Sequence, residues 1–274
     1  MAFPPFAAVI TAAGKSERFN NNSDQTVKKE YLKIEGHTVL YRSIIPFLNV
    51  PNLQAIVVTA PVDLKEECVV ALEELGQRCP VPLVITNGGD SRAESVRNAL
   101  ELVKNLNLGI EYVAIHDGAR CFLTPDLIIS TIATAKVYGA SAPAQIITDS
   151  IKEVDQKGVM IRSYDRKSIV TVQTPQVFHF PEILYAHQTA NESKQYYDDT
   201  EIYSNAGLKV GICMGDPKNI KITYLSDIPD AQSQIEEYIK ARAEGFKKGK
   251  IDKEFRSYLN SFKPPKIALE NENN

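Results

Sequence analysis

The sequence predicts an α/β fold whose central sheet is mostly parallel, and three observations support this prediction. The first is a set of short apolar runs of strand length, each ended by small or polar residues: 6–11, 53–59, 81–86 and 112–116. The second is that segments with helical periodicity lie between and after them, at 38–48, 64–75, 94–106 and 125–138. The third is size, because 274 residues that are 43% hydrophobic can fill the core of one large domain or two small ones. Strands that alternate with helices in this way indicate a sheet covered on both faces.

The alternating order changes after Gly139. Two strand-like segments, 146–154 and 159–164, flank the turn sequence at 155–158. This pattern predicts a β-hairpin inserted into the α/β order. A further helix and a further strand are predicted at 181–190 and 208–214.

The end of the chain differs in composition from the rest. From residue 228 it is charged and amphipathic, which predicts one or two helices through 259. The polar end at 262–274 predicts disorder. We therefore expect one domain at 1–235, followed at 236–274 by a charged helical extension with a disordered end.

Charge and composition exclude several classes of protein. The net charge of 31 − 34 = −3 gives no general basic field, so we expect no nucleic acid as partner. No stretch reaches the length of a membrane span, and the first residues lack the pattern of a secretory signal. The four cysteines form no CxxC pair and have no His at ligand spacing, which predicts free thiols rather than a zinc site. Cytoplasm is the expected location.

Four loops follow strands or precede them at the expected carboxyl edge of the sheet, at 12–18, 87–95, 116–120 and 171–176. Ligands of open α/β sheets bind beyond this edge, so the loops predict one shared site. In the first loop, the small residues Ala12, Ala13 and Gly14 would let backbone N–H groups approach a phosphate. Arg18 and the lysines at 28–29 would add positive charge nearby. A tight turn with solvated cations is an equally good interpretation of this loop taken alone.

The second loop has Gly89 within a Gly-Gly pair, then Asp90, Arg92 and Ser95, which suits backbone contact with a flat base. Taken alone, it is better interpreted as a β-to-α turn in which Asp90 or Ser91 caps the next helix.

The third loop places Asp117 at a strand end, where a carboxylate can bind ribose hydroxyls or Mg²⁺. Arg120 can bind a phosphate or orient Asp117. His116 is better interpreted as a satisfied strand-end histidine than as a catalytic base. From physical reasoning, either Lys218 or Lys221 could reach a triphosphate.

Six segments appear in a fixed order: AAGKSERF, KKEYL, NGGDSRAESV, HDGAR, QTPQVF and NIKIT. Together they resemble the cytidylyltransferases that convert 2-C-methyl-D-erythritol 4-phosphate to its CDP derivative in the non-mevalonate isoprenoid pathway. The resemblance covers roughly residues 6–235. It implies a Rossmann-like nucleotidyltransferase fold, with the hairpin region at about 142–171 as a dimerisation arm. It also implies CTP, Mg²⁺ and a sugar-alcohol phosphate as ligands, in-line attack on the α-phosphorus, and loss of pyrophosphate.

The resemblance also implies roles for individual residues, and it assigns no metal ligand. Arg18 and Lys29 match the cations that stabilise the transition state, and Lys221 matches the lysine that binds the triphosphate. Cytosine would be read by Gly89, Asp90 and Ser95, and Asp117 would lie on the ribose and metal side. The sugar phosphate would be held by Arg120, Ser150 and Arg166, the last supplied by the partner's arm.

Several positions depart from the family's pattern. Ser16 stands where the first loop usually has its second Gly, and the polar stretch at 20–24 lengthens the loop that leads to Lys29. The usual Pro before Lys29 is absent, Cys121 replaces another Pro, and Ser150 replaces Thr.

Other functions remain open at this stage. A related family with the same chemistry makes CDP-ribitol from ribitol 5-phosphate, and it shares the CTP loops. A non-catalytic nucleotide-binding protein is another alternative, but it would be expected to have lost a cation at Arg18, Lys29 or Lys221. A third alternative is that the α/β domain serves as an interaction scaffold. The C-terminal extension is the feature of the sequence that favours this alternative.

Overall fold

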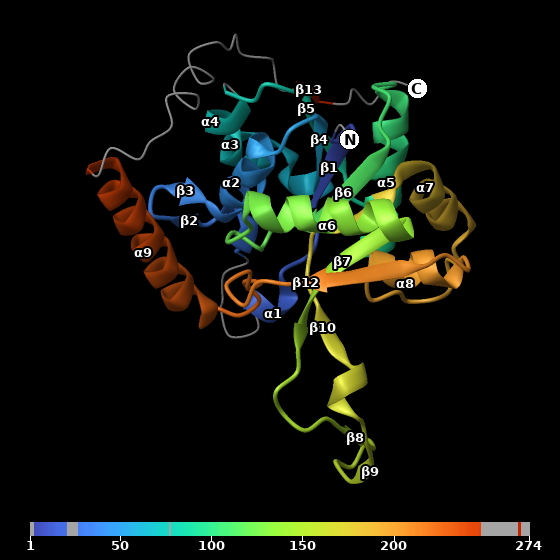
Figure 1. Ribbon diagram of the computed structural model, residues 1–274. Helices are drawn as coiled ribbons and strands as arrows, with labels where there is room; N and C mark the ends of the chain where they lie inside the picture. Colours follow the sequence, from blue (N-terminus) through green and yellow to red (C-terminus); the bar gives the residue numbers. More distant parts are fainter. Residues whose placement is uncertain (1–2, 21–26, 77, 248–267, 270–274) are drawn as a thin grey trace.

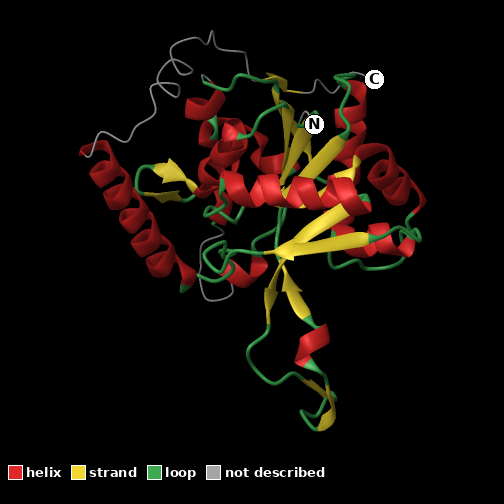
Figure 2. Cartoon of the chain, viewed as in Figure 1, coloured by secondary structure: helices red, strands yellow, loops and turns green. Residues whose placement is uncertain are grey.

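The computed structural model describes residues 3–20, 27–76, 78–247 and 268–269, which form a body with one projecting arm (Figure 1). The body is a twisted sheet with helices on both faces (Figure 2). The predicted α/β class is confirmed, as is the mostly parallel sheet. Within the described part of the chain, no helix has the length and apolar character that a membrane crossing requires.

The central sheet has the order β10-β7-β11-β6-β1-β4-β5-β13, and β12 pairs with β7 off this path. Its core is the parallel set β6-β1-β4-β5, which comes from the four predicted apolar runs. β11 runs antiparallel between β6 and β7. The strands of this sheet are β1 (Phe6–Thr11), β4 (Leu53–Ala60), β5 (Leu83–Asn87), β6 (Tyr112–Asp117), β7 (Ala140–Ile146), β10 (Val170–Val172), β11 (Gln176–His179), β12 (Val210–Met214) and β13 (Ala268–Leu269).

The strands are apolar throughout because both of their faces are buried. In β1, Phe6, Ala8 and Ile10 belong to one hydrophobic cluster, whereas Ala7 and Val9 belong to the cluster on the opposite face. The first face is covered by α2 (Val39–Ile44), α3 (Lys65–Ala71), α4 (Glu73–Gly76) and α6 (Pro125–Tyr138). The second is covered by α5 (Arg92–Asn105), α7 (Phe180–Thr189) and α8 (Asp199–Asn205).

Two predicted helices are shorter than their periodicity indicated. The one at 38–48 changes to a 3-10 helix at Ile45, because Pro46 has no N–H for the α-helical hydrogen bond. The one at 64–75 is divided between α3 and α4. At the break between them, Thr38 Oγ1 donates to the carbonyl of Ala71 at 3.0 Å. This carbonyl is therefore bonded to a side chain instead of to a backbone N–H group of the helix.

β11 and α8 are among the elements that the sequence analysis did not predict. β11 is a four-residue strand that contains Gln176 and His179, so its sequence alone has little strand character. It forms because β6 and β7 both pair with it. α8 is short, but it has a recognisable start: Asp198 Oδ1 accepts from Glu201 N at 2.9 Å, and Glu201 accepts from Tyr197 N.

The arm is continuous with the main sheet. Its base is formed by β7 and β10, which pair antiparallel, and its tip by the hairpin of β8 (Lys152–Val154) and β9 (Met160–Ser163). Asp155 forms the turn, since its Oδ1 accepts from the N–H groups of Lys157 and Val159 at 2.9 Å. The predicted hairpin and its turn are therefore confirmed, although its strands are shorter than 146–154 and 159–164.

A third hydrophobic cluster lies outside the two faces of the sheet. It joins Phe19 of α1 (Glu17–Asn20), Ile34 of β2 (Lys33–Ile34) and Ile222 to Ala231 and Ile235 of α9 (Asp227–Lys247). β2 pairs with β3 (His37–Thr38). Because Phe19 and Ile222 adjoin Arg18 and Lys221, this small core fixes the segments that carry two of the predicted cations.

The expected domain boundary at 235–236 falls inside α9, which continues without interruption to Lys247. The remainder of the predicted helix, 248–259, lies outside the described residues. The same holds for most of the end predicted to be disordered, 262–274. Within that end, β13 pairs in parallel with β5 at the edge of the sheet.

Candidate active site

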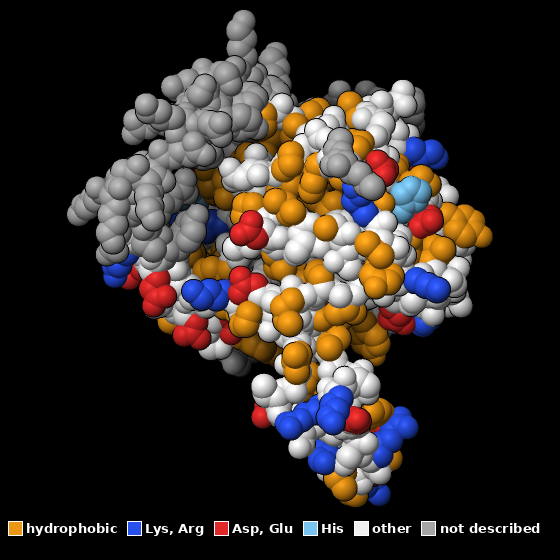
Figure 3. Space-filling view, in the orientation of Figure 1, with side chains coloured by type: hydrophobic (Ala, Val, Ile, Leu, Met, Phe, Trp, Pro, Cys, Tyr) orange, Lys and Arg blue, Asp and Glu red, His pale blue; other side chains and the backbone are white. Residues whose placement is uncertain are grey.

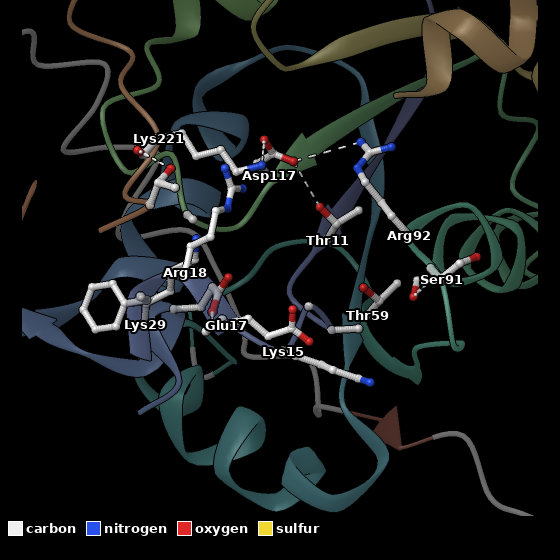
Figure 4. Close-up of a pocket in the computed structure, with 18 of the residues that line it drawn as sticks. Thr11, Lys15, Glu17, Arg18, Lys29, Thr59, Ser91, Arg92, Asp117 and Lys221 are labelled. Carbon is white, nitrogen blue, oxygen red and sulfur yellow. Dashed lines mark hydrogen bonds and ion pairs between the residues drawn. The ribbon is translucent and has the colours of Figure 1, made fainter. Parts of the chain in front are cut away.

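A cavity of about 430 Å³ opens at the carboxyl ends of β1, β5 and β6 (Figure 4). Loops that are far apart in the sequence meet there, as the position of the loops predicted. The residues of the predicted set that line this cavity are Ala13, Gly14, Arg18, Lys29, Gly89, Asp90, Arg92, Ser95, Asp117 and Lys221.

The first loop is tied to the neighbouring strand by its backbone. The N–H of Ala12 donates to Thr59 O at 3.1 Å, and the Ala12 side chain is buried beneath the cavity rather than lining it. A Cβ added to Gly14 would meet nothing within 4 Å, so the space beside this backbone is open. Ser16 has a φ of 55°, in the left-handed region that glycine adopts without strain. Ser16 therefore has a backbone conformation that is more favourable for glycine.

Lys29 lies deep in the wall of the cavity, on a 3-10 turn at Lys29–Tyr31. Its Nζ donates to Ile222 O at 2.6 Å, and the N–H of Ile222 donates to Ala119 O at 2.9 Å. Burial lowers the pKa of Lys29, and the nearby charges of Lys221 and Arg18 act in the same direction. Ile222 thus joins the segments that carry Lys29, Lys221 and the loop after β6.

Asp117 is the charged centre of the site. Its Oδ2 lies 2.8 Å from Lys221 Nζ and 3.5 Å from Arg120 Nε. Its Oδ1 accepts from Thr11 Oγ1 at 3.4 Å and lies 4.0 Å from Arg92 Nη2. Burial alone would raise the pKa of Asp117, but Lys221, Arg92 and Arg120 hold it well below its usual range. The carboxylate is therefore ionised, with Oδ1 the less tightly held oxygen.

His116 is fully buried below Asp117, and its contacts define its tautomer. Nε2 lies 3.1 Å from the carbonyl of Arg120, which can only accept, so Nε2 carries the proton. The hydroxyl of Thr174 accepts from Asp117 N and donates to His116 Nδ1 at 2.9 Å. Burial lowers the pKa of His116 to about 4, so the ring is neutral at pH 7. As predicted, His116 is a satisfied histidine; here it supports the backbone of the third loop.

The second loop is held by its own side chains. Ser95 Oγ accepts from Gly89 N and donates to Ser91 O, both at 2.9 Å. Ser91 is the N-cap of α5, since its hydroxyl accepts from Glu94 N at 3.0 Å. Ser95 thus shapes the loop around Gly89. A base in the cavity would meet the backbone of that loop rather than a free Ser95 hydroxyl.

Besides Ala12, three predicted residues do not line the cavity. Arg120 reaches Asp117 from behind, and its Nη1 donates to Asn219 O at 2.7 Å. Ser150 and Arg166 are on the arm, where Arg166 Nη1 donates to Thr148 O. Within one chain, the structure therefore does not bring Ser150 and Arg166 to the cavity.

The alternative between Lys218 and Lys221 is also resolved by position. Lys221 pairs with Asp117 inside the cavity, whereas the backbone of Lys218 donates to Asp216 in an exposed turn. Residues that the sequence analysis did not select also line the site: Thr11, Lys15, Ser16, Glu17, Phe19, Glu30, Thr59, Ser91, Ala119 and Thr223. Most of these residues are next to predicted site residues in the sequence. Their position in the same loops, rather than their residue type, is the signal that could have identified them.

Figure 4 shows how the charges are arranged. Asp117 lies between Lys221 on one side and Arg92 on the other, and Arg18 points toward Asp117 and Lys221. Lys15 extends in the opposite direction. A cavity with clustered cations, open loop backbone and an ionised Asp117 suits a polyphosphate ligand. In the described part of the chain, no group of three or more His, Cys, Asp or Glu side chains could hold a metal ion by itself.

The family model for 2-C-methyl-D-erythritol 4-phosphate cytidylyltransferase matches residues 6–237. The chain belongs to this family. A curated cytidylyltransferase of that name from Caldanaerobacter subterraneus is 36% identical over 228 residues, which are 82% of this chain and 96% of the relative.

Other relatives of this cytidylyltransferase family are longer than the matched region. A bifunctional enzyme IspD/IspF from Rhodopseudomonas palustris is 36% identical over 234 residues, and the match spans 85% of this chain but 56% of that enzyme. The crystal structure of 4-diphosphocytidyl-2C-methyl-D-erythritol synthase from Anaerococcus prevotii has the same fold. Its TM-score is 0.71 at 24% identity, with 85% of this chain and 96% of that chain covered.

Two glycines of the site give opposite predictions. A Cβ on Gly88 would overlap with Ala13 Cβ, so Gly88→Ala should push the first two loops apart and lower the free energy of unfolding by about 1–3 kcal/mol. Gly14→Ala should leave that free energy within about 0.5 kcal/mol of wild type. It should nevertheless weaken CTP binding, because the methyl group enters the open space beside the backbone. Urea unfolding and CTP titration of both variants measure the two effects. Wild-type CTP affinity in Gly14→Ala would contradict the binding of a phosphate beside the Gly14 backbone.

The buried His116 predicts a pH dependence of stability. Its pKa is about 4 in the folded protein and 6.5 for an unperturbed histidine, so between these values the unfolded chain binds a proton that the folded chain does not. This contribution is constant above pH 6.5. As pH falls from 6.5 to 4, stability should decrease by at most about 1.4 kcal/mol per pH unit. The measurement is urea unfolding from about pH 7.5 to 4.5 for wild type and His116→Gln, which keeps a donor for Arg120 O. Equal pH slopes in the two proteins would show that His116 is not buried as a neutral ring.

Proposed function

We propose that this protein transfers CMP from CTP to 2-C-methyl-D-erythritol 4-phosphate and releases pyrophosphate, a step of non-mevalonate isoprenoid biosynthesis. The observation that carries the proposal is the convergence of Arg18, Lys29 and Lys221 on one cavity beside Asp117. The names of the matched relatives favour this acceptor over ribitol 5-phosphate. The presence of all three cations in the cavity argues against a non-catalytic nucleotide-binding protein.

The chemistry follows from the charges. A phosphate oxygen of the acceptor, already deprotonated at neutral pH, attacks the α-phosphorus of CTP as the bond to pyrophosphate breaks on the opposite side. Negative charge on the transferred group and on the departing pyrophosphate is met by Lys29, Arg18 and Lys221. Lys29 Nζ is held by Ile222 O, so its position is set before the reaction begins. No side-chain base is required, and catalysis rests on positioning and charge neutralisation.

The residues also fit Mg²⁺ as cofactor. Asp117 Oδ1 faces weak partners only, at 3.4 and 4.0 Å, and Mg²⁺ in such sites takes one or two carboxylate oxygens together with substrate phosphates and water. Asp117 would hold the ion, and the ion would neutralise charge on the triphosphate. Thr11 keeps the carboxylate oriented for this, through its hydroxyl.

A homodimer built through the arm is part of the proposal. Figure 3 shows that Lys and Arg side chains gather on the arm, far from the body. Large apolar side chains are also exposed there, among them Val154, Met160 and Ile161. An arm with these properties is suited to pack against a second copy and to deliver Arg166 and Ser150 to the partner's cavity.

The free thiols of the described cysteines agree with a cytoplasmic location.

Lys29→Ala tests the assignment of the reaction. Without the buried ammonium, the transition-state charge loses a fixed partner, so turnover should fall by about 100-fold or more. Pyrophosphate release is measured with CTP, UTP or ATP, and with either 2-C-methyl-D-erythritol 4-phosphate or ribitol 5-phosphate. The matched control is Lys33→Ala, which removes an exposed lysine on β2 and should keep wild-type turnover. Turnover of ribitol 5-phosphate alone, or near-normal turnover in Lys29→Ala, would refute the proposal.

A mixing experiment tests the shared active site. Arg166→Ala and Lys29→Ala should each be inactive, but in a heterodimer one site takes Lys29 from one chain and Arg166 from the other. Mixed after denaturation and refolding, the two variants should recover about one quarter of wild-type activity. If Arg166 acts within its own chain, no heterodimer has an intact site and activity stays at the level of the single variants.

A further inference from the structure

A line of buried charged side chains leads from Asp117 away from the cavity. Arg92 begins α5 and lies between two carboxylates, those of Asp117 and Asp199. Asp199 is completely buried in the first turn of α8, and its Oδ1 lies 3.2 Å from His187 Nε2 on α7. Neither Asp199 nor His187 lines the cavity, and the reaction proposed above uses neither of them.

Asp199 is fixed by the strand next to β6. Gln176, the first residue of β11, accepts from the backbone N–H of Asp199 at 3.1 Å, and it donates to Asp198 at 3.0 Å. Gln176 is paired with Ile115 of β6, the strand that ends at Asp117. Through Gln176, the start of α8 is therefore held in a fixed position relative to β6. The position of the Asp199 carboxylate relative to Asp117 is therefore set by the sheet.

The two ion pairs of Arg92 are unequal. The same atom, Nη2, lies 2.7 Å from Asp199 Oδ2 but 4.0 Å from Asp117 Oδ1. Figure 4 shows the Arg92 side chain extended along the wall opposite Lys221. Burial raises the pKa of Asp199, but Arg92 and then His187 outweigh it and hold the pKa below its usual range. Asp199 is therefore a permanent anion behind the guanidinium.

We propose that Asp199 is a positioning residue that holds Arg92 back from Asp117 and so keeps Asp117 Oδ1 available to the nucleotide. Without the Asp199 charge, the strongest partner left for Arg92 is Asp117, and closing from 4.0 Å to hydrogen-bond distance requires a small side-chain shift. Arg92 would then occupy the oxygen that Thr11 alone contacts at 3.4 Å. Asp199 acts through Arg92 and touches no substrate.

The test begins with the structure of the variant. Asp199→Asn keeps the size of the side chain and removes its charge. In a crystal structure of the full chain, Arg92 Nη2 should lie within about 3 Å of Asp117 Oδ1. Arg92 still at 4.0 Å from Asp117 would overturn the proposal. This measurement does not depend on the proposed function, so it remains decisive even if wild type fails to turn over the proposed substrates.

The functional test rests on the proposed function and uses a double-mutant cycle. Asp199→Asn should weaken CTP binding and lower kcat/KM for CTP by about 10- to 100-fold, as expected when a supporting partner is lost. Arg92→Gln combined with Asp199→Asn should be no worse than Arg92→Gln alone, because the proposed effect of the Asp199 charge acts through Arg92. Additive losses in the double variant, or a lower melting temperature with unchanged CTP affinity in Asp199→Asn, would assign Asp199 a merely structural role.

Asp198→Asn is the matched control. It removes the same charge from the adjacent residue and keeps a side chain able to cap α8, where Asp198 Oδ1 accepts from Glu201 N. Its CTP affinity should equal that of wild type. An equal loss of CTP affinity in Asp198→Asn and Asp199→Asn would indicate a general effect of charge near α8 and would overturn the specific role of Asp199.

Discussion

The arrangement of the site depends on one buried carboxylate. Asp117 ends β6 in the middle of the sheet, where a lone anion would be strongly destabilised. Lys221, Arg120 and Arg92 come from three different segments to neutralise it, so the same ion pairs that satisfy Asp117 also assemble the cavity. Lys29 and Arg18 add further positive charge to the same cavity. In the proposed function, the triphosphate would bring negative charge to these cations, which otherwise repel one another.

Packing maintains these positions. The third hydrophobic cluster contains Phe19, Ile222 and Cys121, the neighbours of Arg18, Lys221 and Arg120, and α9 covers it. Three long, mobile side chains thereby start from fixed backbone, which reduces the entropy lost on ligand binding. Cys121 is buried in this cluster where the family usually has Pro. The small side chain of Cys121 packs within the cluster. This departure from the family's pattern therefore leaves the third loop in place.

Much of this could be predicted because the signals are local. β1, β4, β5 and β6 are apolar runs, and the loops after β1, β5 and β6 contain the small and polar residues that predict the site. β11 could not be found in this way, since it depends on pairing with β6 and β7 on both sides. The role of Asp199 was equally hidden, because Arg92 and Asp199 are distant in sequence and meet only when α8 is anchored to Gln176. Ser150 and Arg166 lie on the arm, so a single chain offers no contact that tests their predicted roles.

The departures from the family in the first loop are compatible with the same arrangement of cations. The non-glycine Ser16 at positive φ is disfavoured by about 1 kcal/mol, but its carbonyl accepts from Phe19 N and Asn20 N, and Phe19 is anchored in the third cluster. Asn20 then closes the lengthened segment. Its Nδ2 donates to Val27 O at 3.1 Å, and its Oδ1 accepts from Val27 N at 3.0 Å. These hydrogen bonds hold Asn20 and Val27 together, with Arg18 on one side of the pair and Lys29 on the other.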